Sequence, residues 1–202
     1  MFFDADGPVP ESLRRLQQRL HDAGIPHIFI GAMAMNAHRY ERMTRDVDVC
    51  VRPADLERFR SRCAGKFYEP VAGRARRFRD RESNVTLDVL ISGEVAGRAE
   101  KQHGIRFPDP DEAEVRGGIP VPSLARLIEL KLVTWRLKGW ADVIELIRAN
   151  ALHADFAEQL QPGARALYRQ CFDQMKEEDK YNAIHEARDD PPASATDAPG
   201  AE

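Results

Sequence analysis

Two acids lie one position apart in a segment that reads as a β-strand, and this segment constrains the fold more than any other. Residues 46–51 read Asp-Val-Asp-Val-Cys-Val. Because successive side chains of a strand point to opposite faces, Val47 and Val49 predict a packed face. Asp46 and Asp48 then share the other face, about 7 Å apart at the backbone. A single acid on a strand usually faces solvent, so the pair needs partners before it indicates a site.

The rest of the chain predicts an α/β (α+β) fold, with a small mixed sheet that carries the acids and is flanked by helices. Apolar periodicity predicts the following helices: 11–24, 32–38, 53–66, 122–139, 140–149 and further helix within 153–184, interrupted at Pro162. Strands are predicted over 26–30, 46–51 and on both sides of a polar turn at 80–84, the second over 85–91. We expect a core over 1–118, a helical C-terminal region over 119–188 and a disordered tail over 189–202, which is rich in proline, alanine and acids.

Composition excludes several classes of protein. With 43% hydrophobic and 31% charged residues, the chain is typical of a globular protein, and no apolar run approaches the length of about 18 that a membrane span needs. The first residues lack the pattern of a signal peptide, so we expect a cytoplasmic protein without membrane association. A net charge of -3 argues against coating nucleic acid by bulk charge, although basic residues concentrate between Arg58 and Arg81. The three cysteines form no zinc-binding pattern.

Two further features give the acid pair its partners. Asp88 lies among apolar residues of a later predicted strand, and the strand over 26–30 ends at Gly31 and opens into a helix, whose free backbone N–H groups suit a phosphate. Three ionised aspartates held together repel one another, and a bound divalent ion removes the free-energy cost of this repulsion. Oxygen ligands without His or Cys favour Mg²⁺ or Mn²⁺. Magnesium held by carboxylates and substrate phosphates is typical of phosphoryl and nucleotidyl transfer.

These residues resemble the motif of the DNA polymerase β-like nucleotidyltransferase superfamily, in which a helix-opening glycine pair precedes an Asp-x-Asp/Glu pair and a third acid. Here Gly31-Ala32 precedes Asp46-Val47-Asp48, and Asp88 follows. The run Arg-Met-Thr-Arg-Asp-Val-Asp over 42–48 is similar to that of small bacterial nucleotidyltransferases of the AbiEii and MenT type. The stretch 119–146 resembles their helical part, so the resemblance covers about residues 10–150.

The resemblance implies a metal-dependent nucleotidyltransferase that moves a nucleoside monophosphate from a nucleoside triphosphate to an acceptor hydroxyl and releases pyrophosphate. It makes Asp46, Asp48 and Asp88 the catalytic and metal-binding residues, and Asp88 the residue that accepts the proton of the acceptor. Backbone groups of Gly31 and Ala32 would hold the outer phosphates.

Three basic residues are the other nucleotide-binding candidates. Lys131 lies in the apolar stripe of its helix and would reach the triphosphate, or it buries its stem and extends its ammonium to solvent. Arg42 and Arg45 are alternatives for pairing with Asp48 or with phosphate. Thr44 reads as structural.

The acceptor stays open among RNA, protein and small hydroxylated antibiotics. The toxin branch of the family implies a tRNA or other RNA end and a cognate antitoxin as partner. Two departures from the motif keep an alternative open, a catalytically silent nucleotide- or partner-binding module: Ala32 replaces the second glycine, and Gly139 stands where the family often has an acid. Asp142, which would supply that acid's role, reads as a surface residue at a helix start. An unrelated phosphohydrolase is a third interpretation.

Overall fold

The computed structural model describes residues 6–97, 104–134 and 136–189 and has the mixed α/β fold that the sequence predicts. The helices are α1 (Pro8–Asp22), α2 (Gly31–Ala37), α3 (Pro53–Arg62), α4 (Leu124–Leu132), α5 (Leu137–Ala149) and α6 (Pro162–Asp189), with short 3₁₀ turns η3 (Pro110–Glu112) and η4 (Ala154–Gln159). The strands are β1 (His27–Ile30), β2 (Asp46–Val51), β3 (Tyr68–Pro70), β4 (Arg77–Asp80), β5 (Thr86–Ile91), β6 (Glu114–Arg116) and β7 (Ile119–Val121).

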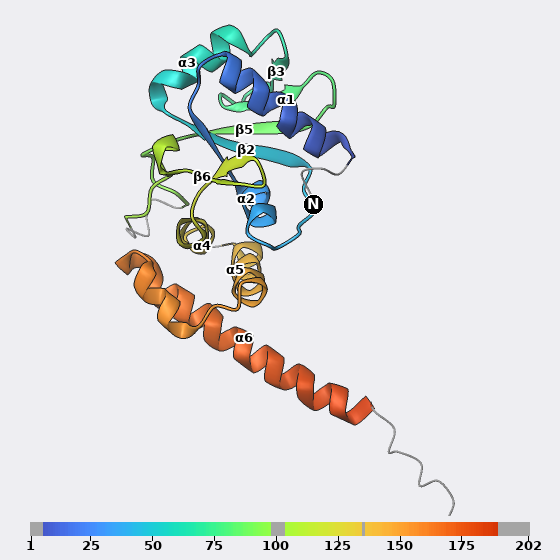
Figure 1. Ribbon diagram of the computed structural model, residues 1–202, viewed down its shortest axis with the longest axis vertical. Coiled ribbons are helices and arrows are strands. Elements are labelled where there is room, and N and C mark those ends of the chain that lie inside the picture. The colour runs from blue at the N-terminus through green and yellow to red at the C-terminus, as the bar shows by residue number, and fades with distance from the viewer. Residues whose placement is uncertain (1–5, 98–103, 135, 190–202) are drawn as a thin grey trace, which may run out of the picture.

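The main sheet places β2 and β5 side by side at its centre. Its strand order is β1-β2-β5-β4-β3, and β6 and β7 form a separate two-stranded sheet. β2 and β5 run parallel, whereas the other pairs of the main sheet are antiparallel. A parallel pair needs a crossover connection, and α3, β3 and β4 lie in the chain between these two strands. Figure 1 shows α1 and α3 on one side of the sheet, and α2, α4 and α5 on the other.

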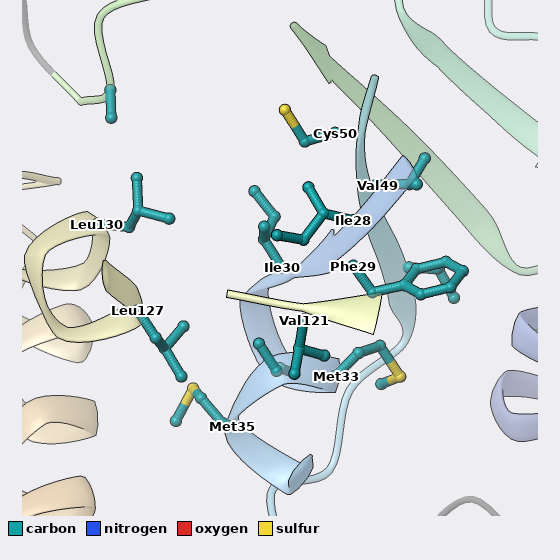
Figure 2. Packing of buried hydrophobic residues seen from close by; sticks show 14 of the residues in the cluster. Ile28, Phe29, Ile30, Met33, Met35, Val49, Cys50, Val121, Leu127 and Leu130 are labelled. Atoms are coloured by element: carbon teal, nitrogen blue, oxygen red, sulfur yellow. The ribbon is translucent and has the colours of Figure 1, made fainter. Parts of the chain in front are cut away.

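The two faces of the sheet differ in chemistry. On β2 and β5 all valines and Leu87 are buried, whereas Asp46, Asp48 and Asp88 are only partly buried, as is Leu90 on the face of Asp88. Figure 2 shows Phe29 and Val49 directed to one face, and Ile28, Ile30 and Cys50 directed to the face nearer α4. The period-two pattern of the sequence is therefore confirmed.

A buried carboxylate fastens α1 to the sheet. Asp80, which is 1% exposed, accepts hydrogen bonds from Ser12 Oγ at 2.7 Å, from Arg15 Nη2 at 2.8 Å and from Ser83 Oγ at 2.9 Å. Burial alone would raise the pKa of Asp80, but these donors outweigh burial and lower that pKa to about 2. The apolar stripe of α1, Leu13, Leu16 and Leu20, is buried as predicted.

The boundary between α4 and α5 differs from the prediction. The sequence predicts one helix over 122–139 that breaks at Gly139, but α4 ends at Leu132 and Gly139 lies inside α5. A Cβ atom at Gly139 would lie 2.8 Å from the carbonyl oxygen of Lys131 and 2.7 Å from Thr134 Oγ1. Gly139 therefore serves the close approach of two helices rather than a helix end.

The segment between β5 and α4 contains the β6–β7 hairpin. Its turn residues Gly117 and Gly118 have φ of 57° and 80°, as a two-residue hairpin turn requires. β7 packs against β1. This hairpin lies at the predicted division at residue 118, which itself stays a prediction. Residues 190–202 of the predicted tail lie outside the described residues, and Asp189 is the last residue of α6.

Helix α6 starts at Pro162, where the sequence predicts a helix interruption, and packs against α4, α5 and η4. Figure 1 shows it running past these helices and away from the sheet. In the described ranges, no helix has both the length and the apolar character of a membrane span.

Candidate active site

Strand pairing brings the three predicted aspartates onto one face of the sheet. In the parallel β2–β5 pair, Asp48 lies directly opposite Asp88, and Asp46 is two residues before Asp48. On the other side of β2, Ile30 lies opposite Asp48, so that the next residue, Gly31, begins α2 above that carboxylate. Asp46, Asp48 and Asp88, the acid cluster, therefore converge at the start of a helix.

Gly31 leaves room for the Asp48 carboxylate. Its φ is +65°, a left-handed conformation that glycine adopts without strain. A Cβ atom at this position would lie 2.1 Å from Asp48 Oδ2. A side chain at position 31 and the carboxylate of Asp48 therefore exclude each other. Ala32, the second residue of the predicted motif, is buried and does not line the cleft described below.

Asp48 carries a charge that the protein does not satisfy. Burial, followed by the nearby carboxylates of Asp46 and Asp88, raises the pKa of Asp48 to about 6. The positive charges of Lys131 and Arg77 act in the opposite direction and offset only part of this effect. Across the ranges that the structure describes, the Asp48 side chain accepts no hydrogen bond. A cation bound beside Asp48 would remove the free-energy cost of keeping this carboxylate ionised.

The other two acids have protein partners. The hydroxyl of Thr44 donates a hydrogen bond to Asp46 Oδ1, which agrees with the structural role predicted for Thr44. Arg77 on β4 lies opposite Asp88 and donates two hydrogen bonds to it, from Nε to Oδ1 and from Nη2 to Oδ2, both 2.7 Å long. The sequence placed Arg77 only in a general basic run, so this pair was missed.

Lys131 is held at the cleft by a buried acid from the next helix. Its Nζ donates to Asp142 Oδ2 at 2.9 Å, and the same oxygen accepts from Arg42 Nη1 at 2.5 Å. Burial lowers the pKa of Lys131, while Asp142 opposes that effect. Asp142 is 4% exposed, so its interpretation as a surface acid was wrong. Its spacing of four residues from Leu146, a buried residue of α5, is the signal that predicts an inward direction.

A cleft of about 930 Å³ opens over the acid cluster. Gly31 and the three acids line one side, and Lys131 and Arg136 come from the α4–α5 region. The segment 73–77 forms a further part of the wall, and Thr134 lies beside Lys131 in the lining. Arg76 pairs with Glu94, but Arg74 and Arg136 make no side-chain hydrogen bond or ion pair with any part of the chain that the structure describes.

Arg42 and Arg45 do not reach the cleft. Arg42 is committed to Asp142, and Arg45 is exposed and has no side-chain partner among the described residues. Neither lines the cleft, so neither pairs with Asp48 in this structure. His38 is also outside it, because it is buried and its Nε2 lies 2.8 Å from the carbonyl oxygen of Pro122.

The donor atoms suit a hard divalent cation, although the cluster is not arranged around one. Among the described residues, no group of three His, Cys, Asp or Glu side chains is placed to hold an ion together. Both oxygens of Asp88 are engaged by Arg77, and one oxygen of Asp46 by Thr44. Carboxylates without His or Cys are the donor set that Mg²⁺ and Mn²⁺ prefer, and no hydrogen bond from the described residues competes for Asp48.

Fold and cleft together define a mixed α/β protein with an acid cluster that faces basic side chains across an open cleft. No family model matches the sequence, and no curated protein matches it. Among solved structures, the chain is similar to the solution structure of the antibiotic-resistance factor ANT(2″)-Ia, with 13% identity, a TM-score of 0.45 and coverage of 86% of this chain and 95% of that chain. It is also similar to the crystal structure of ANT(2″)-Ia in complex with adenylyl-2″-tobramycin, with 15% identity, a TM-score of 0.47 and coverage of 80% and 97%. With TM-scores below 0.5, these similarities leave the function to be argued from the residues of the cleft.

Proposed function

We propose that the protein is a metal-dependent nucleotidyltransferase that moves a nucleoside monophosphate from a nucleoside triphosphate to an acceptor hydroxyl. The observation that carries this proposal is the pairing of Asp48 with Asp88 beneath Gly31, opposite Lys131 across the cleft. Two carboxylates in register, a close backbone approach and a facing ammonium are the parts that transfer from a triphosphate needs.

Each residue has a distinct role in this proposal. Asp46 and Asp48 would hold Mg²⁺ or Mn²⁺, which would supply positive charge to neutralise the triphosphate. Asp88 accepts the proton of the acceptor hydroxyl once its carboxylate is released from Arg77. Lys131, oriented by Asp142, stabilises the charge that develops on the departing pyrophosphate. Gly31 lets the phosphates approach the backbone at the start of α2.

We further propose that the acceptor is an RNA end, with tRNA favoured. Arg74 and Arg136 line the cleft and have no acidic partner in the described chain, so they are available to a phosphate backbone. A small neutral acceptor would not need two such charges. Transfer to tRNA ends would also support a toxin role neutralised by a cognate antitoxin, and arrest of growth on expression would test that role.

A catalytically silent nucleotide-binding module is the second candidate. The bidentate Arg77–Asp88 pair favours it, because this pair occupies the third carboxylate. Such a module would bind nucleotide without turnover.

A transfer assay separates these candidates. The protein is incubated with each labelled nucleoside triphosphate, Mg²⁺ or Mn²⁺, and total tRNA, bulk RNA or an aminoglycoside, and both product and pyrophosphate are measured. We expect incorporation into RNA that is lost in Asp48→Ala and retained in Asp173→Asn, an exposed acid outside the cleft. Equal product from Asp48→Ala and the native protein would refute the enzyme, and binding without pyrophosphate release would identify the silent module.

A further inference from the structure

Arg77 is positioned as a counter-ion of the acid cluster as well as a partner of Asp88. Cross-strand pairing places Asp48, Asp88 and Arg77 in one row across β2, β5 and β4. Adjacent strands are about 4.8 Å apart. The guanidinium of Arg77 therefore lies beside the carboxylate of Asp88, and the carboxylate of Asp48 lies one strand further on. Asp88 raises the pKa of Arg77, and the carboxylates of Asp46 and Asp48 raise it further. All three acids therefore act on this cation.

The pair with Asp88 competes with a metal ion for the same carboxylate. Nε and Nη2 of Arg77 each donate to a different oxygen of Asp88, at 2.7 Å. This two-point geometry engages both carboxylate oxygens of Asp88. A divalent cation held by Asp88 would therefore compete with Arg77 for the lone pairs of these oxygens.

Arg77 is able to leave. Its side chain is 43% exposed and that of Asp88 is 24% exposed, and ion pairs at such exposure are weak compared with buried ones. The backbone of Arg77 is fixed at the start of β4, where Val71 N donates to its carbonyl oxygen at 3.0 Å. A change of rotamer therefore moves the guanidinium within the cleft wall while the strand stays in place.

We propose that Arg77 is an exchangeable counter-ion: a divalent cation replaces it on Asp88, and the released guanidinium then binds the polyphosphate of the nucleotide. This inference rests on the proposed function for the identity of the ligands. It assigns to one side chain two opposite effects, because Arg77 competes with the metal and assists the nucleotide. A residue that only stabilised β4 would not move the two affinities in opposite directions.

The first test is Mn²⁺ binding to the full chain without nucleotide, measured by the signal of free Mn²⁺ in electron paramagnetic resonance. Arg77→Gln should bind Mn²⁺ about fivefold more tightly than the native protein, since it removes both a competing hydrogen-bonded partner and a repelling charge. Arg79→Gln is the matched control, because Arg79 lies on the same strand, is exposed and does not line the cleft. Arg77→Lys keeps the charge but not the two hydrogen bonds to Asp88. Its Mn²⁺ affinity should therefore lie between those of the native protein and Arg77→Gln.

The second test is the affinity of a non-hydrolysable triphosphate at saturating Mg²⁺. Arg77→Gln should weaken it about fivefold, whereas Arg79→Gln should not change it. Unchanged or weaker Mn²⁺ binding by Arg77→Gln overturns the inference, as does a shift of both affinities in the same direction, and urea unfolding verifies that each variant is folded. If the native protein and the Arg77 variants show the expected Mn²⁺ and triphosphate affinities but the native protein transfers no nucleotide, the proposed enzyme activity is refuted. The role of Arg77 as an exchangeable counter-ion is then retained. If neither the native protein nor Arg77→Gln binds Mn²⁺, both the proposed metal-dependent function and the counter-ion inference are refuted.

Discussion

Replacing Asp48 with asparagine should stabilise the metal-free protein at neutral pH. The folded-state pKa of Asp48 is about 6, against an ordinary value of 3.8, a difference of about 2 pKa units. At about 1.4 kcal/mol per unit, the ionised carboxylate costs up to about 3 kcal/mol of folding free energy. Because the Asp48 side chain retains some contact with solvent, we expect Asp48→Asn to recover about 2 kcal/mol.

The gain should depend on pH. A pKa that is higher in the folded state means that folding favours the protonated acid, so the cost is absent well below the unfolded value of 3.8 and complete above about 6. The stability of the native protein should therefore fall as pH rises through this window, relative to Asp48→Asn. At pH 4.5 the difference should be about one third of its value at pH 7.5.

Urea and thermal unfolding with a chelator at pH 7.5 and pH 4.5 measure both effects. For a chain of this length, about 2 kcal/mol corresponds to a rise in Tm of about 4 to 8 °C. Asp173→Asn is the matched control, since Asp173 is exposed and lies outside the cleft, and it should give no gain. An Asp48→Asn variant that is no more stable than the native protein at pH 7.5, or whose gain is equal at both pH values, would contradict the electrostatic reasoning.

Three other substitutions test separate parts of the structure. Asp142→Ala should destabilise the protein by about 3 kcal/mol in urea unfolding, because it leaves the charges of Lys131 and Arg42 without their partner, and should lower transfer more than tenfold. Gly31→Ala should cost about 2 kcal/mol and abolish Mn²⁺ binding in titrations, because its Cβ meets Asp48. Asp80→Ala should cost about 3 kcal/mol. Because the pKa of Asp80 is depressed to about 2, the stability it adds is complete above its ordinary value of 3.8 and is lost as pH falls toward 2, so acid titrations should show no such loss in the variant.

Local patterns in the sequence were sufficient for the elements that carry the acid cluster. Alternation over 46–51 predicted β2, and the glycine after a short apolar run predicted the start of α2. These signals depend on neighbouring residues only, and they also give the faces of the strands. The mixed α/β class followed from the order of the elements.

Long-range pairing was beyond the sequence. The register that places Asp48 opposite Asp88 depends on a crossover through α3, β3 and β4, and no residue near either acid encodes it. The contact of Arg42 with Asp142 likewise joins residues 100 positions apart. The roles of the acids, of Lys131 and of the metal remain predictions of the proposed function.

The contact between Gly31 and Asp48 has a consequence for how related sequences can vary. The two residues occupy one volume, since a Cβ at position 31 would lie 2.1 Å from the carboxylate oxygen. A lineage that loses the acid releases that space, and a lineage that gains a side chain at position 31 first needs a smaller residue at position 48. Substitutions at these two positions should therefore occur together, and a descendant with a bulky residue at 31 should be one that has given up its acid.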